Sequence, residues 1–218
     1  MLTEKLKMKK GVVGIIGLGY VGLPLALEFT NESIKVVGFD IDQEKISTIE
    51  SGMSYIEHIS NEKILKAISG TLSVTTDFSF IQKMDAIIIC VPTPLDKFRE
   101  PDLSYVTNTM ENILPFLKKD QVLSLESTTY PGTCDEILKP MIEQKNISVG
   151  ENFYLVYSPE REDPGRKDYT TKTIPKVCGG TTPKCLEVGL ALYEPVIDTV
   201  VPVSSTKVAE MTKILENI

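Results

Sequence analysis

Short apolar runs rich in β-branched residues alternate with longer amphipathic stretches along the chain. Such runs predict strands buried on both faces, and apolar residues three or four apart predict helices packed on them. Strands are expected at 11–16, 35–39, 72–76, 85–91, 121–125, 154–157, 176–178 and 198–202, the last at a sheet edge. Helices are expected at 23–32, 43–51, 105–117, 133–144, 183–193 and 205–218. This alternation predicts an α/β fold, with a doubly wound, mostly parallel sheet covered by helices on both faces.

The last expected helix has an apolar side but no stop signal. Val208, Met211, Ile214 and Leu215 share one side of it, and neither glycine nor proline closes it. We therefore expect one domain over 1–203, with 204–218 beginning a longer helix that continues beyond this sequence. The alternative is a helix that frays at a natural C-terminus.

Composition narrows the class of protein. The 218 residues are 42% hydrophobic and 24% charged, a balance typical of a globular domain. A net charge of −7 with dispersed basic residues gives no support to nucleic-acid binding. No apolar run approaches the roughly 20 residues of a membrane helix, and the charged first ten residues do not resemble a signal peptide. We expect a cytoplasmic protein without a membrane partner.

A glycine motif, Gly17-Leu-Gly19-Tyr-Val-Gly22, follows the first strand and opens a helix. Gly17 suits a tight turn, Gly19 the close approach of a pyrophosphate, and Gly22 close packing of helix on sheet. The helix N-terminus directs N–H groups toward the phosphates. The motif predicts a Rossmann-type dinucleotide site.

Asp40 ends the second strand, about 20 residues after the motif, where a carboxylate can accept hydrogen bonds from a ribose diol. A carboxylate there repels a 2′-phosphate, which favours NAD over NADP. As an alternative, Asp40 could cap the next helix, but Asp42 is better placed for that. A flavin or another nucleotide is the alternative ligand.

Polar residues also follow later strands, at the edge where open α/β sheets bind ligands. Val91, Pro92 and Thr93 end the fourth strand, Ser127 and Thr128 the fifth, and Glu160 follows the sixth. Glu160 could act as a general base. The alternatives are turn residues at the first two places and a solvated charge run, 160–163, at the third.

Six segments in fixed order carry a family resemblance. They are Gly-Leu-Gly-Tyr-Val-Gly-Leu-Pro-Leu-Ala (17–26), Gly-Phe-Asp-Ile-Asp (38–42), Cys-Val-Pro-Thr-Pro (90–94), Pro-Asp-Leu-Ser-Tyr-Val (101–106), Glu-Ser-Thr-Thr-Tyr-Pro-Gly-Thr (126–133) and Tyr-Ser-Pro-Glu-Arg-Glu-Asp-Pro-Gly (157–165). Together they resemble the UDP-glucose/GDP-mannose dehydrogenase family from Val12 to Asn217. The chain looks most like the branch that acts on UDP-N-acetylhexosamines, particularly UDP-N-acetylglucosamine 6-dehydrogenases.

The resemblance implies an NAD-dependent, four-electron oxidation of a UDP-sugar C6 alcohol to a carboxylate, in polysaccharide precursor synthesis. It implies that a cysteine holds the aldehyde as a thiohemiacetal and then as a thioester. It also implies a homodimer or higher homo-oligomer formed through the central helix that 204–218 begins. The catalytic residues implied are Thr128, Glu160, Lys213 and Asn217. The cofactor residues implied are Gly17, Gly19, Tyr20, Val21, Gly22, Asp40, Val91, Pro92, Thr93, Ser127 and Thr128, and the substrate residues Glu160 and Arg161.

The chain departs from the family pattern in two places. The glucose-oxidising branch has a second acid four residues after the first, whereas here the run is Glu160-Arg-Glu-Asp-Pro-Gly165, so Glu162 and Asp163 receive no role. The family's nucleophile lies in a Gly-Gly-x-Cys-x-Pro motif that this sequence lacks. The chain is therefore expected to bind NAD without turning over a UDP-sugar.

The remaining thiols and the single imidazole receive no catalytic role. Cys90, Cys134, Cys178 and Cys185 are interpreted as reduced packing residues, although Cys134 starts a helix, where a thiol pKa can fall. His58 has no partner at catalytic or metal-ligand spacing and is interpreted as a loop residue.

Three alternatives stay open at this point. The protein could be a UDP-glucose 6-dehydrogenase, or a β-hydroxyacid dehydrogenase of the 6-phosphogluconate type, which shares a similar dinucleotide domain. It could also be a free-standing NAD-binding module without catalysis.

Overall fold

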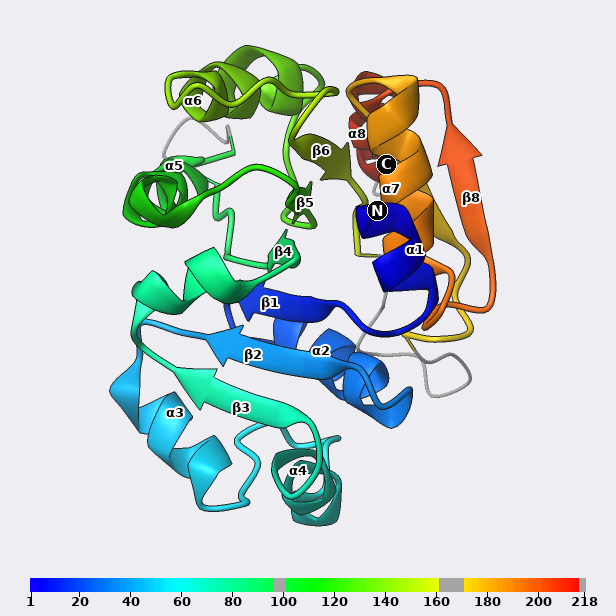
Figure 1. The fold of residues 1–218 in the computed structure, drawn as a ribbon. Coiled ribbons are helices and arrows are strands. Elements are labelled where there is room, and N and C mark those ends of the chain that lie inside the picture. Colours follow the sequence, from blue (N-terminus) through cyan, green and yellow to red (C-terminus); the bar gives the residue numbers. More distant parts are fainter. Residues whose placement is uncertain (96–100, 161–170, 216–218) are drawn as a thin grey trace.

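A twisted sheet runs through the whole molecule (Figure 1). The computed structural model describes residues 1–95, 101–160 and 171–215. Within them the sheet has eight strands in the order β3-β2-β1-β4-β5-β6-β7-β8. The strands are β1 (Val12–Ile16), β2 (Lys35–Phe39), β3 (Leu72–Thr75), β4 (Ala86–Ile89), β5 (Val122–Leu125), β6 (Tyr154–Tyr157), β7 (Lys176–Gly180) and β8 (Val200–Val203). All the predicted strands are present, and β8 is an edge as expected.

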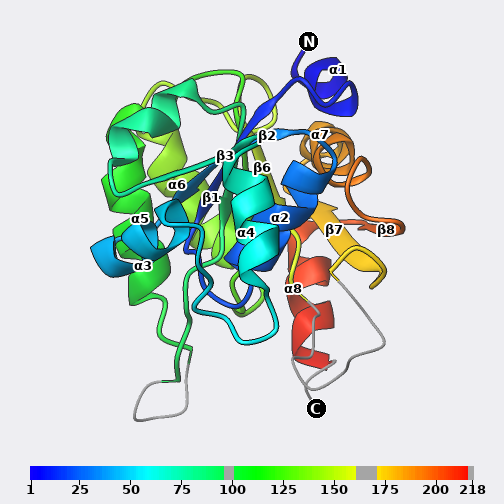
Figure 2. The ribbon, with the colours of Figure 1, turned by 90° about the horizontal axis from the view of Figure 1, so that it is seen from below.

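Helices cover both faces of the sheet, with α5 and α6 on one side and α2 and α7 on the other (Figure 2). The α-helices are α1 (Leu2–Lys7), α2 (Gly22–Asn31), α3 (Gln43–Glu50), α4 (Asn61–Ile68), α5 (Ser104–Ile113), α6 (Lys139–Glu143), α7 (Pro183–Tyr193) and α8 (Thr206–Leu215). Two 3₁₀ segments, η1 (Phe78–Lys83) and η2 (Leu114–Phe116), and a π-helical segment, η3 (Thr133–Leu138), complete the described elements. The doubly wound fold is confirmed.

The strands are parallel except where β7 joins the sheet. β6 and β7 pair antiparallel, with Val156 opposite Gly180 and Tyr157 opposite Gly179, and β8 pairs parallel to β7. The carboxyl ends of β1, β2, β4, β5 and β6 therefore meet at one edge, and β7 begins at that edge rather than ending there.

The centre of the sheet is apolar on both faces, as its sequence predicts. Every residue of β4, β5 and β6 is buried. Phe29 of α2 and Phe39 of β2 pack on one half of the sheet, and Tyr157 and Tyr193 on the other. The free energy gained by burying these apolar side chains holds the strand ends in place, and with them the polar residues that follow.

Two predicted helices end or distort at prolines. The helix expected at 105–117 changes to 3₁₀ at Leu114, because Pro115 has no N–H to donate one turn back. The helix expected at 133–144 begins as the π-helical η3 and becomes regular only in α6, where Pro140 removes another such bond. Helices α1 and α4 were not expected. Helix α4 is capped by Ser60, whose side chain accepts from the Lys63 N–H.

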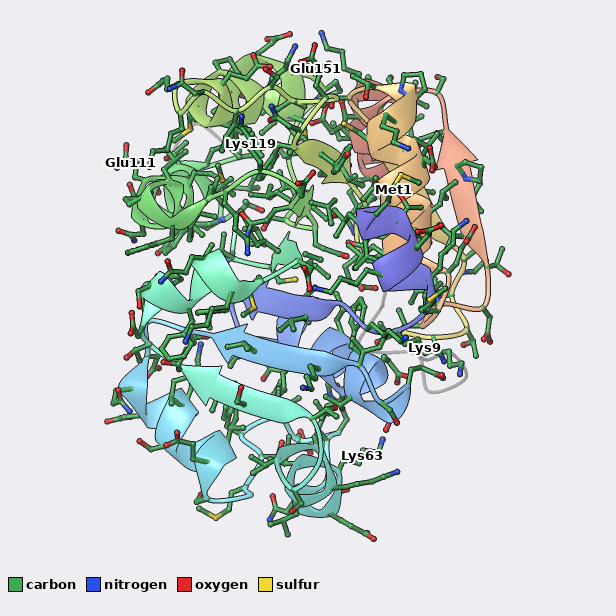
Figure 3. All side chains as sticks on the ribbon, in the orientation of Figure 1. Met1, Lys9, Lys63, Glu111, Lys119 and Glu151 are labelled. Carbon is green, nitrogen blue, oxygen red and sulfur yellow. The ribbon has the colours of Figure 1, made fainter. Side chains whose placement is uncertain are left out.

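Charged side chains of both signs lie around the outside. Figure 3 shows Lys63, Glu111 and Glu151 at the edge of the molecule, and Lys9 and Lys119 are also exposed. In the part of the chain that the structure describes, no helix combines the length and apolar character that crossing a bilayer requires.

Candidate functional site

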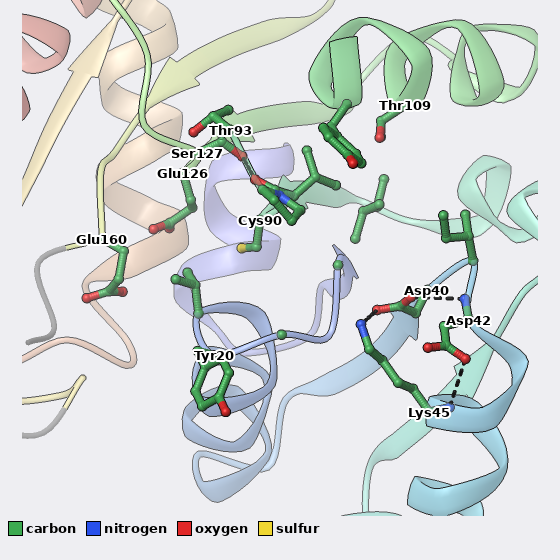
Figure 4. Close-up of a pocket in the computed structure, with 18 of the residues that line it drawn as sticks. Tyr20, Asp40, Asp42, Lys45, Cys90, Thr93, Thr109, Glu126, Ser127 and Glu160 are labelled. Carbon is green, nitrogen blue, oxygen red and sulfur yellow. Dashed lines mark hydrogen bonds and ion pairs between the residues drawn. The ribbon is translucent and has the colours of Figure 1, made fainter. Parts of the chain in front are cut away.

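A cleft of about 760 Å³ opens at the edge of the sheet where the parallel strands end (Figure 4). Most of the site residues expected from the sequence line it. They are Gly17, Gly19, Tyr20, Val21, Asp40, Val91, Pro92, Thr93, Ser127, Thr128, Glu160 and Lys213. Gly22 lies behind the wall of the cleft, whereas Arg161 and Asn217 fall outside the described residues.

The glycine motif forms a tight turn whose three glycines have different surroundings. Gly17 has φ +91° and donates its N–H to the Phe39 carbonyl at 2.8 Å. A Cβ on Gly22 would lie 1.9 Å from the Gly17 carbonyl oxygen, so the helix can pack there only without a side chain. A Cβ on Gly19 would meet nothing within 4 Å, which leaves open space on the cleft side for a phosphate. This arrangement fits a dinucleotide pyrophosphate.

Asp40 lies at one end of the cleft, at the carboxyl end of β2. One carboxylate oxygen accepts from the Leu18 N–H at 2.9 Å and from Lys45 Nζ at 3.3 Å, and the other from the Asp42 N–H at 3.0 Å. Asp42 caps α3 by accepting from the N–H groups of Glu44 and Lys45, as predicted. Asp40 is therefore not the helix cap, and its four lone-pair sites leave capacity for a ribose hydroxyl.

Tyr55, from the loop between α3 and α4, adds to the same end of the cleft. Its hydroxyl donates to the Leu18 carbonyl, and burial, helped by the charge of Asp40, raises its pKa. Nearby on the same loop, the His58 ring stacks on Tyr20 with centroids 6.3 Å apart. The loop thus contacts the glycine turn, and His58 is a loop residue as expected.

The loops after β4 and β5 form the middle of the cleft. The Ser127 hydroxyl donates to the Val91 carbonyl at 2.7 Å, and the Tyr157 hydroxyl donates to the Ser127 carbonyl at 3.2 Å. Ser127 therefore joins the two loops, a role its turn-like sequence did not reveal. Thr128 is exposed to the cleft.

Glu160 and Lys213 meet at the other end of the cleft, although 53 residues separate them. Lys213 reaches from α8, and its Nζ donates to the Glu160 backbone carbonyl at 2.7 Å. Figure 4 shows Glu160 across the cleft from Asp40. The cleft thus has a carboxylate suited to a ribose at one end and a carboxylate with an ammonium group at the other.

A buried ion pair that the sequence pattern did not reveal lies beneath this second end. Lys176 Nζ lies 2.6 Å from Glu126 Oε2 and 3.8 Å from Glu160 Oε2. The Tyr193 hydroxyl donates to Glu126 Oε1 at 2.7 Å. Burial would lower the pKa of Lys176, but the charges of Glu126 and Glu160 outweigh it and raise that pKa. The sequence did carry a signal for this pair. Glu126 and Lys176 are charged residues at the ends of segments that otherwise look like fully buried strands.

All four cysteines are buried, in agreement with a packing role. Burial raises the pKa of Cys90, which lines the cleft, well above its ordinary value. The lowered pKa considered for Cys134 is wrong, because burial first and Glu210 second raise it. The thiols of Cys90 and Cys134 are therefore protonated near neutral pH and poorly suited to be nucleophiles.

Comparison with known proteins agrees with this geometry. Residues 11–197 match the NAD binding domain of the UDP-glucose/GDP-mannose dehydrogenase family. The chain belongs to this family. That assignment sets aside the β-hydroxyacid dehydrogenase alternative and makes NAD the cofactor of the domain.

Individual relatives lie in the branch expected from the motifs. The chain is 39% identical to UDP-N-acetyl-D-glucosamine 6-dehydrogenase of Pseudomonas aeruginosa, over 96% of this chain and 50% of the relative. It is 34% identical to the enzyme of the same name from Salmonella typhi, over 94% and 48%. The UDP-N-acetyl-mannosamine dehydrogenase Cap5O of Staphylococcus aureus has a similar structure, with a TM-score of 0.86, 35% identity and coverage of 94% and 50%. The chain thus spans about half the length of these relatives.

Proposed function

We propose that this chain is the NAD-binding part of a UDP-N-acetylhexosamine 6-dehydrogenase, which oxidises the C6 alcohol of the sugar to a carboxylate. The observation that carries the proposal is the cleft, which places Asp40 and the glycine turn at one end and Thr128, Glu160 and Lys213 toward the other. The names of the similar proteins from P. aeruginosa, S. typhi and S. aureus support a UDP-N-acetylhexosamine over UDP-glucose.

The first part of the proposal concerns the cofactor. Gly17, Gly19 and Gly22, with Tyr20 and Val21, would hold the pyrophosphate at the start of α2, and Asp40 would accept from the adenosine ribose. The loops after β4 and β5 would line the nicotinamide side. The residues assigned there are Val91, Pro92, Thr93, Ser127 and Thr128. When bound, NAD supplies the hydride acceptor.

The second part concerns the residues that would face the sugar. Thr128 is exposed at the carboxyl end of β5, where its hydroxyl would orient a substrate hydroxyl or a water. The Glu160 carboxylate would remove a proton from a water that attacks the acyl intermediate. Lys213 would stabilise negative charge that develops on the C6 oxygen. Arg161 and Asn217 are assigned to the sugar nucleotide and the oxyanion from the family motifs alone.

The third part concerns domain organisation. Residues 1–203 would form the NAD-binding domain, and 204–218 would begin the helix through which two copies associate. The catalytic cysteine and most contacts to the sugar nucleotide would come from a part of the protein that this chain does not contain.

Two measurements test the proposal. Calorimetry on residues 1–218 should detect NAD binding, with NADP binding more weakly. The complete protein, given UDP-N-acetylglucosamine, UDP-N-acetylmannosamine and UDP-glucose in turn, should form NADH and the corresponding uronate from an N-acetylated sugar. Uronate formed only from UDP-glucose would favour the UDP-glucose 6-dehydrogenase alternative. Binding of NAD without turnover by the complete protein would favour the non-catalytic module.

A further inference from the structure

A buried charged cluster closes the floor of the cleft where Glu160 lies. Its members are Glu126 at the end of β5, Lys176 at the start of β7 and Tyr193 at the end of α7. The Glu126 side chain is 0% exposed and the Lys176 side chain 5%. Each oxygen of Glu126 has a partner, Lys176 Nζ at 2.6 Å and the Tyr193 hydroxyl at 2.7 Å. The Tyr193 hydroxyl also lies 2.8 Å from Ser124 Oγ, and Lys176 Nζ lies 5.2 Å from the Tyr193 ring centroid.

Stability alone is a weak reason for such a cluster. Taking two charges out of water costs about as much as their attraction returns, and well-packed apolar residues often replace buried ion pairs without loss. Charged groups held in this way beside a ligand cleft are instead found where a site needs a fixed electrostatic arrangement. A function in the adjacent cleft therefore explains this cluster better than stability does.

The reversal of β7 explains how the cluster reaches the cleft. Because β7 is antiparallel to β6, with Tyr157 opposite Gly179, its first residue lies beyond the end of β6. Continuing that register by three residues in each direction brings Lys176 opposite Glu160. Lys176 Nζ is accordingly 3.8 Å from Glu160 Oε2 while it also binds Glu126. A β7 running parallel to β6 would direct Lys176 to the opposite edge of the sheet.

Among the described residues, two lysines from different elements contact Glu160. Lys176 lies against its carboxylate, and Lys213 donates to its backbone carbonyl at 2.7 Å. Glu160 and Glu126 line the cleft, whereas the buried Lys176 does not, so Lys176 can act on a ligand only through these two carboxylates. Of the two, the Glu160 side chain is the one with exposed surface, 13% against 0%. Glu126 and Tyr193 in turn leave the Lys176 ammonium group little freedom to move.

We propose that Lys176 is a positioning residue that holds the Glu160 carboxylate at the substrate end of the cleft, and that Glu126 and Tyr193 fix Lys176 for this purpose. The inference rests on the proposed function, in that Glu160 is taken as the base. It adds a requirement for a buried ammonium group on β7, behind that base.

The test is a set of variants of the complete protein. Lys176→Met alone would leave the Glu126 charge buried without its cation, so it is combined with Glu126→Gln, which keeps an acceptor for Tyr193. The double variant should lower kcat by about tenfold to a hundredfold, as expected when a reacting group is misplaced, while KM for NAD stays unchanged. Lys176→Arg, which keeps the charge and can reach both carboxylates, should retain most of kcat. The matched control is Lys184→Met, which removes a surface lysine paired with Glu187 and should change neither constant.

A double-mutant cycle separates positioning from a general structural effect. If Lys176 acts through Glu160, then adding K176M and E126Q to Glu160→Gln should cause no further loss of kcat. Losses that multiply would overturn the proposal, as would wild-type kcat in the K176M/E126Q variant. If thermal unfolding shows that this variant does not fold, Lys176→Gln combined with E126Q takes its place with the same expectations, because the amides introduced at the two positions can hydrogen-bond to each other without a buried charge.

A crystal structure of residues 1–218 with K176M and E126Q needs no substrate. The Glu160 carboxylate should occupy a different rotamer from that of the unmodified chain, and an unmoved carboxylate would overturn the proposal. If the complete protein shows no turnover with any UDP-sugar, the proposed function fails, but this structural measurement still decides whether Lys176 positions Glu160.

Discussion

At the scale of single residues, two glycines of the same turn have different roles. Gly22 is needed for packing of the fold, and Gly19 for ligand binding. A Cβ on Gly19 would meet nothing within 4 Å, whereas a Cβ on Gly22 would lie 1.9 Å from the Gly17 carbonyl oxygen. Gly19→Ala should change the free energy of unfolding by less than about 0.5 kcal/mol. It should nevertheless weaken NAD binding by at least about tenfold, because the methyl group occupies the space for the pyrophosphate.

Gly22→Ala should behave in the opposite way. It should lower the free energy of unfolding by about 1–3 kcal/mol, because α2 must move away from the turn. Urea denaturation and calorimetry with NAD, made on both variants, check the pair of expectations. Unchanged NAD affinity in Gly19→Ala would contradict the placement of the pyrophosphate.

Glu32 gives the molecule an acid-sensitive ion pair far from the cleft. Its carboxylate lies 2.8 Å from Lys172 Nζ and 2.6 Å from Lys9 Nζ, and these two cations lower its pKa to about 2. Because the folded pKa lies below the ordinary glutamate value of 4.5, the stabilisation is complete above that value and disappears as the pH falls toward 2.

The Glu32→Gln variant should therefore melt below the wild type near neutral pH, and the difference should shrink as the buffer is acidified. Thermal unfolding across that pH range measures it. Added salt should reduce the difference, because both lysines are about two-fifths exposed, at 41% and 42%. The exposed Glu151, changed to Gln, is the control. A difference that persisted at the lowest pH would show that the charge of Glu32 is not its cause.

Sequence reasoning identifies site residues best where local rules apply. Asp42 was predicted as a helix cap because it directly precedes the helix start. Gly17 was predicted to form a tight turn because it follows the first strand in the glycine motif. Lys176 was missed because its role depends on residues of three other elements, and nothing in the local pattern names them. The lowered pKa considered for Cys134 was wrong because burial, and after it the charge of Glu210 from 76 residues away, raises that pKa. Neither cause can be read from the local sequence pattern.

At the scale of elements, Glu210 joins α8 to the loop after β5. Its buried carboxylate accepts from the Gly132 N–H at 2.6 Å and from the Cys134 N–H at 3.0 Å. Glu210→Ala would leave two buried N–H groups without an acceptor, so it should lower the free energy of unfolding by about 2–4 kcal/mol. Urea denaturation measures this effect.

Glu136→Gln is the matched control, because it removes a carboxylate of the same neighbourhood that is exposed and pairs with the exposed Lys207. It should change stability by less than about 1 kcal/mol. Equal effects of the two substitutions would contradict the assignment of Glu210 as the link between α8 and this loop.

The boundaries of the elements show what the sequence pattern leaves open. Apolar runs predicted all the described strands, but not the reversal of β7, because a buried strand has the same composition in either direction. The effects of Pro115 and Pro140 were not anticipated. Both helices lose regularity there because proline lacks the N–H that a regular helix uses as a donor. Helix α1, with six residues, is too short for a period to stand out. Helix α4 was missed although its eight residues equal those of the predicted α3 and it buries one face, through Ile64 and Ala67.

At the scale of the whole molecule, ligand binding and folding should be coupled. NAD at a hundredfold excess over its Kd should stabilise the folded chain by about 2.7 kcal/mol. For a domain of this size that corresponds to a rise in Tm of roughly 5–10 °C. NADP at the same concentration should raise Tm less, because the Asp40 carboxylate repels a 2′-phosphate.

Differential scanning calorimetry with each cofactor measures the two shifts. The Asp40→Asn variant should narrow the gap between them, because it removes the charge that opposes the 2′-phosphate. Equal shifts in the unmodified chain would mean that Lys45, which lies 3.3 Å from Asp40, turns toward the phosphate instead.

The global arrangement of the site was predictable in outline. The rule that ligands lie at the carboxyl ends of parallel strands predicts Asp40, Thr93, Thr128 and Glu160 at one edge from the sequence alone. The contact between Lys213 and the Glu160 carbonyl could not be derived from spacing, since it depends on how α8 crosses the end of β6.

The hydrogen bonds of Asp40 have one more consequence, for the entropy of binding. Its carboxylate is already oriented by the N–H groups of Leu18 and Asp42. Folding therefore orders both this acceptor and the adjacent glycine turn, and a ribose that arrives there immobilises little more of the protein. Such preorganisation favours affinity. It also makes the site selective, because a rigid acceptor cannot adjust its shape to a ligand that lacks the diol.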